Sequence, residues 1–260
     1  MELLKGGYKV ENEAKMTQDE PDMPNMKVSI WRESNGDGRF EQYDVPAQEN
    51  QTVLDVVAYV QQEIDPTLSY RFACRVGMCG SCAMMVNGAP RWTCRTHVSK
   101  VLDGNQLEVA PLRNLPVIKD LVADMDPFFD KWVAAEAVFH PSATRHDPMA
   151  AITPDDPQRL AASDAIECIN CAVCYAACDV VAANSDYFGP AALNRSWSLV
   201  NDSRDAGQDL RMAAVASNGG CFNCHSQQGC VQYCPNELNP TLSIAGLKRA
   251  ATKNIFGRGR

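Results

Sequence analysis

The residues with the most distinctive chemistry in this sequence are its twelve cysteines, which fall into three compact groups of four. The groups occupy residues 74–94, 168–178 and 221–234. The first 25 residues hold six acidic side chains and no apolar segment, which is not typical of a secretory signal or of an Arg-rich transit peptide. Without export, disulfides are disfavoured, so we interpret the clustered cysteines as metal ligands.

The first group follows the plant-type [2Fe–2S] spacing, in which Cys-x4-Cys-x2-Cys precedes a distant fourth cysteine. Its members are Cys74, Cys79, Cys82 and Cys94. Gly77 and Gly80 leave room for backbone N–H groups to approach the negatively charged sulfurs of a cluster. Zinc is the alternative, but zinc usually takes paired Cys-x2-Cys knuckles, and the group has a single such pair. The spacing therefore predicts a [2Fe–2S] cluster.

The second group is spaced like the run of bacterial two-cluster ferredoxins, whose fourth cysteine ligates the other cluster. It consists of Cys168, Cys171, Cys174 and Cys178. The returning half of the pattern consists of Cys224, Cys230 and Cys234. Gln227 stands where the run would have a further cysteine. The crossover rule predicts a [4Fe–4S] cluster held by Cys168, Cys171, Cys174 and Cys234.

Three thiolates remain for the last cluster, namely Cys178, Cys224 and Cys230. Three thiolates fit a [3Fe–4S] cluster, which is a cubane that lacks one iron. The alternative is a [4Fe–4S] cluster whose fourth ligand is Gln227, water or Cys221. Because such clusters are held mainly by cysteine thiolates, we predict [3Fe–4S]. Cys221 is then surplus, and we interpret it as a small buried apolar side chain.

Residues 26–110 are predicted to form mixed β structure with one helix. Alternating apolar residues and turn signals indicate strands at residues 27–32, 40–45, 83–86, 89–93 and 107–110. Turns are predicted at residues 35–38 and, in a tight hairpin, at Asn87-Gly88. Thr52 and Asp55 form a capping-box pattern ahead of a helix that extends to Ile64. Strands with one packed helix and a cysteine loop resemble the β-grasp ferredoxin.

From about residue 120 the pattern becomes helical. Helices that begin at or near proline are predicted at residues 154–167, 190–200 and 240–252. Residues 140–157 are rich in Pro, Asp and Thr and are predicted to form an irregular crossover.

The predicted fold class is α+β, with two domains behind an extension. Residues 1–25 are expected to be a disordered extension, and residues 26–125 a β-grasp ferredoxin domain of the plant [2Fe–2S] type. Residues 126–260 are expected to be an all-α domain like the two-cluster bacterial ferredoxins, with the [4Fe–4S] and [3Fe–4S] clusters.

Composition excludes some classes of function. The chain has 260 residues, 45% hydrophobic residues and a net charge of −8. An acidic chain of this kind is not expected to bind nucleic acid, which usually requires a basic patch. No window approaches the roughly 18 consecutive apolar residues of a transmembrane helix. If the protein works at a membrane, another chain must hold it there.

The stretch from about Met26 to Lys253 resembles the iron–sulfur subunit of succinate dehydrogenases and fumarate reductases. Residues 74–82, CRVGMCGSC, are close to the first-cluster loop of that family, and residues 111–122, PLRNLPVIKDLV, to its inter-domain segment. Residues 168–178, CINCAVCYAAC, together with residues 189–192 and 201–205, look most like bacterial quinol:fumarate reductases.

The resemblance implies a mechanism and partners. A flavoprotein subunit with covalently attached FAD would interconvert succinate and fumarate, and this chain would contribute no catalytic residue. It would pass single electrons through [2Fe–2S], [4Fe–4S] and [3Fe–4S] clusters to a quinone. Transmembrane anchor subunits, which can carry haem, would hold it peripherally on the cytoplasmic face of the bacterial inner membrane.

In this family the quinone lies between the [3Fe–4S] cluster and the anchor. Lys248 falls where the family has a lysine, and His225 directly follows Cys224 and is of a residue type that can move protons to a quinone. Both are predicted quinone-site residues, with an ordinary packed or solvated side chain as the alternative. Ala183 stands where ubiquinone-type enzymes have a tryptophan, which favours menaquinone.

One further departure from the family pattern concerns the third cluster. Asp179 replaces the proline that commonly follows the fourth cysteine of the run. An ionised Asp179 near the cluster would lower its reduction potential, whereas a solvent-facing one would have little effect.

Two other functions compete with this interpretation. A free-standing multi-cluster ferredoxin would have no use for the inter-domain segment. The iron–sulfur subunit of another flavin-linked complex, of the heterodisulfide reductase or glycolate oxidase type, would usually carry two full cubane runs, and Gln227 interrupts one of them here.

Overall fold

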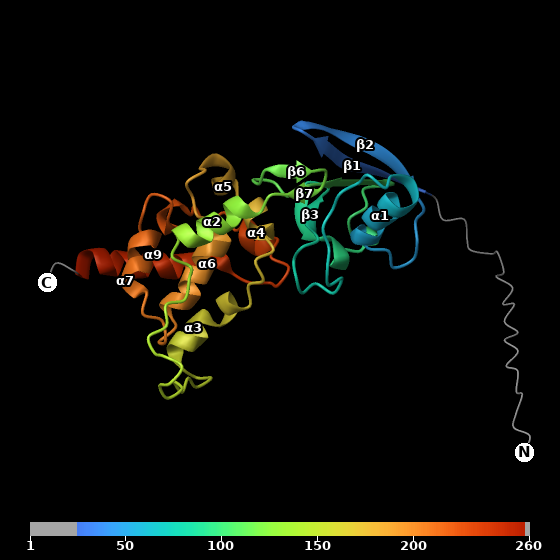
Figure 1. Cartoon of the computed structure of the whole chain (residues 1–260). Coiled ribbons are helices and arrows are strands. Elements are labelled where there is room, and N and C mark those ends of the chain that lie inside the picture. The colour runs from blue at the N-terminus through green and yellow to red at the C-terminus, as the bar shows by residue number, and fades with distance from the viewer. Residues whose placement is uncertain (1–24, 258–260) are drawn as a thin grey trace, which may run out of the picture.

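A twisted sheet and a bundle of helices lie against one another in the computed structural model, which describes residues 25–257 (Figure 1). The predicted disordered extension, apart from Asn25, lies outside the described residues. The placement of a domain boundary after residue 125 stays a prediction.

The main sheet within the described residues has five strands in the order β2-β1-β5-β3-β4. Their bounds are β1 Met26–Ser34, β2 Asp37–Val45, β3 Ala83–Val86, β4 Ala89–Trp92 and β5 Gln106–Ala110. β1 and β5 are parallel, and the other neighbours are antiparallel. All the predicted strands are therefore confirmed. The first turn is narrower than predicted, because Asp37 and Gly38 already pair with β1.

A helix packs on this sheet and starts as the sequence predicts. Thr52 accepts from the Asp55 backbone N–H and Asp55 in turn caps Thr52, which is a complete capping box. Helix α1 (Val53–Tyr59) continues into a π-helical turn, η1 (Val60–Ile64). Val53, Val56 and Val60 are buried against the apolar side chains of β1 and β5. Short 3-10 turns, η2 (Thr93–Arg95) and η3 (Val98–Lys100), close this part of the chain.

The inter-domain segment is not helical at residue 120, contrary to the prediction. It forms a small antiparallel sheet of β6 (Val117–Lys119) and β7 (Val122–Ala123), and the first helix of the second half begins at Asp126. The reason is the backbone of Asp120, which has a φ of +50°. Its buried carboxylate accepts from Arg32 and from the backbone N–H groups of Glu33 and Ser69. This side chain holds the segment against the sheet.

The second half is helical, as predicted. Its helices are α2 Asp126–Ala134, α3 Pro157–Ile166, α4 Val173–Ala176, α5 Asp179–Ala183, α6 Gly189–Val200, α7 Gln208–Val215, α8 Gly229–Gln232 and α9 Pro240–Gly257, with a 3-10 turn, η4, at Cys221–Asn223. Helix α6 is the central one and packs against α3 and α9 (Figure 1). Helix α3 starts later than predicted, because Asp156 caps it and Pro157 takes its first position.

The predicted crossover has no helix or strand between residues 140 and 156. Its start is fixed by an ion pair between Arg211 and Asp205, whose side chains are completely buried and 2.7 Å apart. Arg211 also donates to the carbonyl oxygens of Glu136 and Val138. The pair therefore provides hydrogen bonds for a stretch of irregular backbone, and each of its two buried charges compensates the other.

Arg211→Met is expected to lower the free energy of unfolding by roughly 3–5 kcal/mol, because Asp205 would keep a buried and unpaired charge. Arg204→Met is the matched control, since Arg204 pairs with Asp202 but is 53% exposed. It should cost about 0–1 kcal/mol. Urea denaturation of the two variants measures the difference, and equal losses would contradict the assigned role of the buried pair.

Candidate iron–sulfur centres

The loop that carries the first cysteine group aims backbone donors at sulfur. Cys74 Sγ accepts from the N–H groups of Met78 and Cys79, at 3.2 and 3.3 Å. Backbone donors, that of Val76 foremost, lower the pKa of Cys74 to about 6. The turn needs the left-handed backbone of Gly77 and Gly80, whose φ angles are +75° and +71°. The loop therefore stabilises a thiolate.

The four thiols of this group form two pairs. Cys79 Sγ lies 3.5 Å from the Cys74 backbone nitrogen, on the outer side of the loop. Cys82 and Cys94 are both buried, and Thr93 fixes them through two hydrogen bonds to the Cys82 carbonyl oxygen. Burial, together with the neighbouring Cys82 thiol, raises the pKa of Cys94 to about 12. Two pairs of sulfurs match the needs of two irons with two protein ligands each.

The second candidate centre is a cavity, called the second cavity below, that is lined by Cys168, Cys171, Cys174 and Cys234. Asn170 and Ala172 both have a φ of +61°, and these left-handed residues turn the loop so that its cysteines face the same space. Burial raises the pKa of the Cys168 and Cys174 thiols, and that of Cys171 to about 11. The surrounding side chains are mostly apolar.

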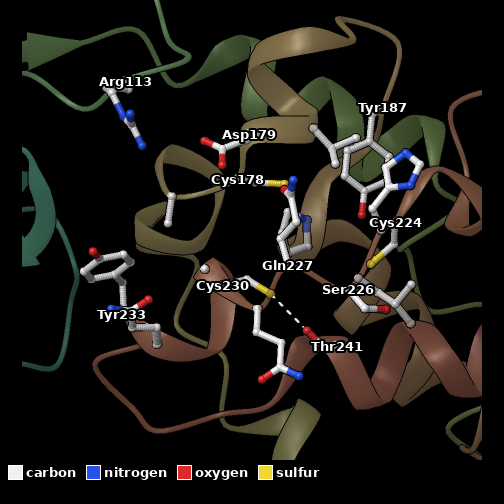
Figure 2. A pocket seen from close by; sticks show the side chains of 18 of the residues that line it. Arg113, Cys178, Asp179, Tyr187, Cys224, Ser226, Gln227, Cys230, Tyr233 and Thr241 are labelled. Carbon is white, nitrogen blue, oxygen red and sulfur yellow. Dashed lines mark hydrogen bonds between the residues drawn. The ribbon is translucent and has the colours of Figure 1, made fainter.

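The third candidate centre is a cavity of about 390 Å³, called the third cavity below, that is lined by Cys178, Cys224 and Cys230 (Figure 2). Tyr187 and Thr241 also line it, and Thr241 Oγ1 lies 3.4 Å from Cys230 Sγ. Burial, with the nearby Cys224 thiol, raises the pKa of Tyr187, so its phenol stays neutral.

Gln227 lines the same cavity at its exposed mouth. Figure 2 draws it between Cys178 and Cys230. Its neighbours Ser226 and Gln228 both have left-handed backbones, with φ angles of +58° and +65°. The loop therefore brings three thiols and one amide to the third cavity.

The chemistry of these donors fits iron–sulfur clusters. All twelve cysteines are free thiols, although they lie in three groups. A thiol whose pKa is raised by burial keeps its proton until a metal displaces it, and a cluster supplies the positive iron that does so. Within residues 25–257, no three His, Cys, Asp or Glu side chains are gathered closely enough for a single metal ion. Cluster ligands stand farther apart, because iron and sulfide atoms lie between them.

The centres follow one another through direct contacts. A Cβ atom on Gly80 would lie only 2.5 Å from Cys171 Cβ, so the first cysteine loop touches the second. Cys174 belongs to helix α4, and Cys178 comes two residues after that helix. Asn114 donates to the carbonyl oxygens of Tyr175 and Cys178, at 2.9 and 3.3 Å. The inter-domain segment is thereby fixed to the turn between the second and third centres.

The two predicted quinone-site residues both lie next to Cys224, on different elements. Lys248 Nζ, on α9, donates to the Cys224 carbonyl oxygen at 2.6 Å and is half-buried. His225 is exposed and lines the third cavity. Cys221 is completely buried, and burial raises its pKa to about 11. Asp179 is exposed at the mouth of the third cavity, where water screens its charge.

Sequence reasoning missed three side chains around these centres. Trp92 lines the second cavity, and Tyr187 and Thr241 line the third. Trp92 lies two residues before Cys94 in the sequence, which was a usable signal. Tyr187 and Thr241 reach their cysteines only through tertiary packing, so no spacing rule points to them.

Of the helices in residues 25–257, none combines the length and apolar character needed to cross a membrane.

Comparison with known proteins gives a match in each half of the chain. Residues 25–130 match a family model described as a 2Fe-2S iron-sulfur cluster binding domain. Residues 167–239 match one described as a 4Fe-4S dicluster domain. A chain of the Mycobacterium smegmatis Sdh1 complex in the apo form superimposes with a TM-score of 0.80 at 24% identity, covering 90% of this chain and 98% of that one. This likeness confirms the predicted fold class.

Two relatives have similar sequences over most of their length. The fumarate reductase iron-sulfur subunit of Mycobacterium tuberculosis is 36% identical over 236 residues, which is 89% of this chain and 94% of that protein. The succinate dehydrogenase iron-sulfur subunit of Paracoccus denitrificans is 34% identical over 210 residues, which is 78% of this chain and 77% of that protein. This chain belongs to the family of iron–sulfur subunits of fumarate reductases and succinate dehydrogenases, the electron-transfer components of those oxidoreductases.

Proposed function

We propose that this chain passes single electrons between a flavoprotein subunit and a quinone, through a [2Fe–2S], a [4Fe–4S] and a [3Fe–4S] cluster in that order. The clusters would supply one-electron exchange, which links a two-electron flavin to a quinone. Cys74, Cys79, Cys82 and Cys94 would hold the first. Cys168, Cys171, Cys174 and Cys234 would hold the second, and Cys178, Cys224 and Cys230 the third.

The observation that carries the proposal is the chain of contacts between the three cysteine groups. Gly80 of the first group lies against Cys171 of the second. The second and third groups share the turn of α4, between Cys174 and Cys178. Between the second and third groups the path runs beside the buried residues Val173, Ala176 and Ala177. Tightly packed protein of this kind keeps neighbouring centres at fixed separations.

The flavoprotein is proposed to dock on the first cysteine loop. Met78 is 68% exposed and Val76 is 58% exposed, although both are apolar. Arg75 stacks on Phe72 beside them, 4.7 Å from the ring centroid. An apolar patch with a positive charge at its edge is typical of a protein interface, and here it covers the Cys74 end of the path.

The quinone is proposed to bind at the opposite end of the path, beside Cys224. His225 is exposed there and could exchange protons, whereas Lys248 holds the Cys224 carbonyl oxygen. Lys248 would therefore act by fixing the ligand loop and by adding positive charge. Ala183 is exposed at the end of α5 and offers no indole, which supports menaquinone.

A peripheral membrane position follows from this assignment. The described residues contain no membrane-spanning helix. Transmembrane anchor subunits, with or without haem, would hold the chain on the cytoplasmic face of the bacterial inner membrane and form the other wall of the quinone site.

The direct test is metal analysis and EPR of the purified complex. We expect about nine irons per chain and no zinc, which is the sum for clusters with two, four and three irons. The oxidised sample should show a [3Fe–4S] signal, and reduction should add the signals of the other clusters. Zinc, or an iron content far below this value, would refute the assignment.

Gln227→Cys is expected to add a fourth thiolate to the third group, since Gln227 lines its cavity. Iron content should rise by about one atom per chain, and the [3Fe–4S] signal of the oxidised sample should disappear as a [4Fe–4S] cluster forms. Phe222→Cys places a thiol at an exposed position of the same segment, outside the lining of the cavity, and should leave both unchanged. Loss of the signal in both variants would mean that the loop, and not the ligand count, determines the cluster type.

Thr241→Val is expected to lower the midpoint potential of the third cluster. A ligating Cys230 has no proton, so the Thr241 hydroxyl at 3.4 Å must be the donor, and its bond stabilises the more negative, reduced cluster. A threefold to tenfold change in the reduced-to-oxidised ratio corresponds to about 30–60 mV.

Thr241→Ser keeps the hydroxyl and should keep the potential. Thr252→Val, on the exposed side of the same helix, controls for effects on α9. Potentiometric EPR titration measures all three variants, and an unchanged midpoint in Thr241→Val would show that this hydroxyl does not tune the cluster.

A further inference from the structure

The indole N–H of Trp92 is buried and has no hydrogen-bond partner among residues 25–257. Trp92 is at the end of β4 and is only 7% exposed. An indole nitrogen can only donate, and a buried donor without an acceptor is destabilising. Two other tryptophans satisfy this need, since Trp31 donates to Glu33 and Trp197 to the Ala161 carbonyl oxygen, both at 2.8 Å. Trp92 and Trp132 do not, and of these two only Trp92 lines a cysteine cavity, where the sulfurs of a bound cluster would be acceptors.

The Trp92 indole lies between the first and second centres. A Cβ atom on Gly77 would lie 3.0 Å from Cζ3 of Trp92, so the six-membered ring abuts the first cysteine loop. Trp92 also lines the second cavity beside Cys171, where its N–H counteracts the burial that raises the pKa of the Cys171 thiol, although the contact lacks the geometry of a full hydrogen bond. It packs in one apolar cluster with Cys82, Cys94 and Val173. One side chain from the sheet domain thus reaches the cysteines of the helical domain.

Few other side chains can donate into the second cavity. The amide of Asn194 already donates to the Ala165 carbonyl oxygen at 3.2 Å, and that of Asn236 to the Glu167 carbonyl oxygen at 2.9 Å. Asn170 presents its carbonyl oxygen to the Cys168 thiol. The other donors are backbone N–H groups, from Leu238 to Cys234 Sγ at 3.4 Å, from Asn170 to Cys168 and from Val173 to Cys171. In so apolar a cavity, one additional donor has a large electrostatic effect.

We propose that the Trp92 indole donates a hydrogen bond to the Cys171 thiolate of the [4Fe–4S] cluster, and so raises the reduction potential of that cluster selectively. This rests on the second centre of the proposed function. Reduction adds one electron, and its charge spreads over the sulfurs. A donor on a ligand sulfur stabilises the reduced state more than the oxidised state. Trp92 is a positioning residue, since it acts on the centre through Cys171.

The test is potentiometric EPR titration of the intact complex with Trp92→Phe, which keeps an aromatic ring but removes the donor. The ratio of reduced to oxidised second cluster at a fixed potential should fall threefold to tenfold, a midpoint lower by about 30–60 mV. The midpoints of the first and third clusters should not move. An unchanged second midpoint, or an equal fall in all three, would overturn the proposal.

Trp132→Phe is the matched control. Its indole N–H is also buried without a partner among the described residues, but Trp132 lies on α2 and lines neither the second nor the third cavity. This variant should leave every midpoint unchanged. If Trp132→Phe lowers the second midpoint as much as Trp92→Phe does, the effect is one of general packing and the proposal fails.

A measurement on the unmutated complex keeps the proposal testable if Trp92→Phe does not assemble. Tryptophan labelled with ¹⁵N in the indole should give a nitrogen coupling to the reduced second cluster in pulsed EPR. Absence of that coupling, with the cluster signal present, would contradict the proposal. Absence of the second-cluster signal itself would instead refute the proposed function.

Discussion

The van der Waals contact between Gly80 and Cys171 brings the first cysteine loop onto the second, and neither loop could approach so closely with a larger side chain at position 80. The left-handed backbone of Gly80 is needed at the same point. The rest of the molecule supports this contact. Asp120 ties the inter-domain segment to the sheet, and Asn114 ties it to the turn after α4. The sheet and the helical half, which also share a small apolar cluster around Trp92 and Val173, are thereby held in one fixed arrangement.

Burial and hydrogen bonding act on the thiols in opposite directions. Burial raises the pKa values of Cys174, Cys178 and Cys230 and thus disfavours their bare thiolates. Hydrogen-bond donors, such as the backbone N–H groups of the first loop and the Thr241 hydroxyl, instead favour the thiolate form. Iron resolves the conflict where burial dominates, while the donors set how readily each centre accepts an electron. The same local chemistry therefore governs both assembly and potential.

Most of the fold could be predicted from the sequence, because its signals were local. The capping box at Thr52 and the Asn87-Gly88 turn specify their own geometry, and both are present. The segment around Asp120 was wrongly expected to be helical, since its conformation depends on partners such as Arg32, 88 residues away. The ends of α3 and α9 also differ from the expected ones, as helix ends often do.

The candidate centres likewise contain residues with a local sequence signal and residues without one. The second and third cavities each combine cysteines from two segments of the chain, since Cys234 joins the 168–174 run and Cys178 joins Cys224 and Cys230. Which of these thiols ligate which cluster stays a prediction. Trp92 and Thr241 donate across elements distant in sequence from their acceptors, so spacing could not reveal them. Lys248 was expected near the quinone, and its bond to the Cys224 carbonyl oxygen adds a role in fixing the ligand loop.

The position of Trp92 over the second cavity has a consequence for how that cavity is closed. The cavity is walled partly by the helical half and partly by this residue of the sheet domain. Docking of the two halves therefore completes this wall, while Cys171 itself stays half-buried. A helical half separated from the sheet domain would lack the Trp92 wall, and water would then reach the second cavity from that side.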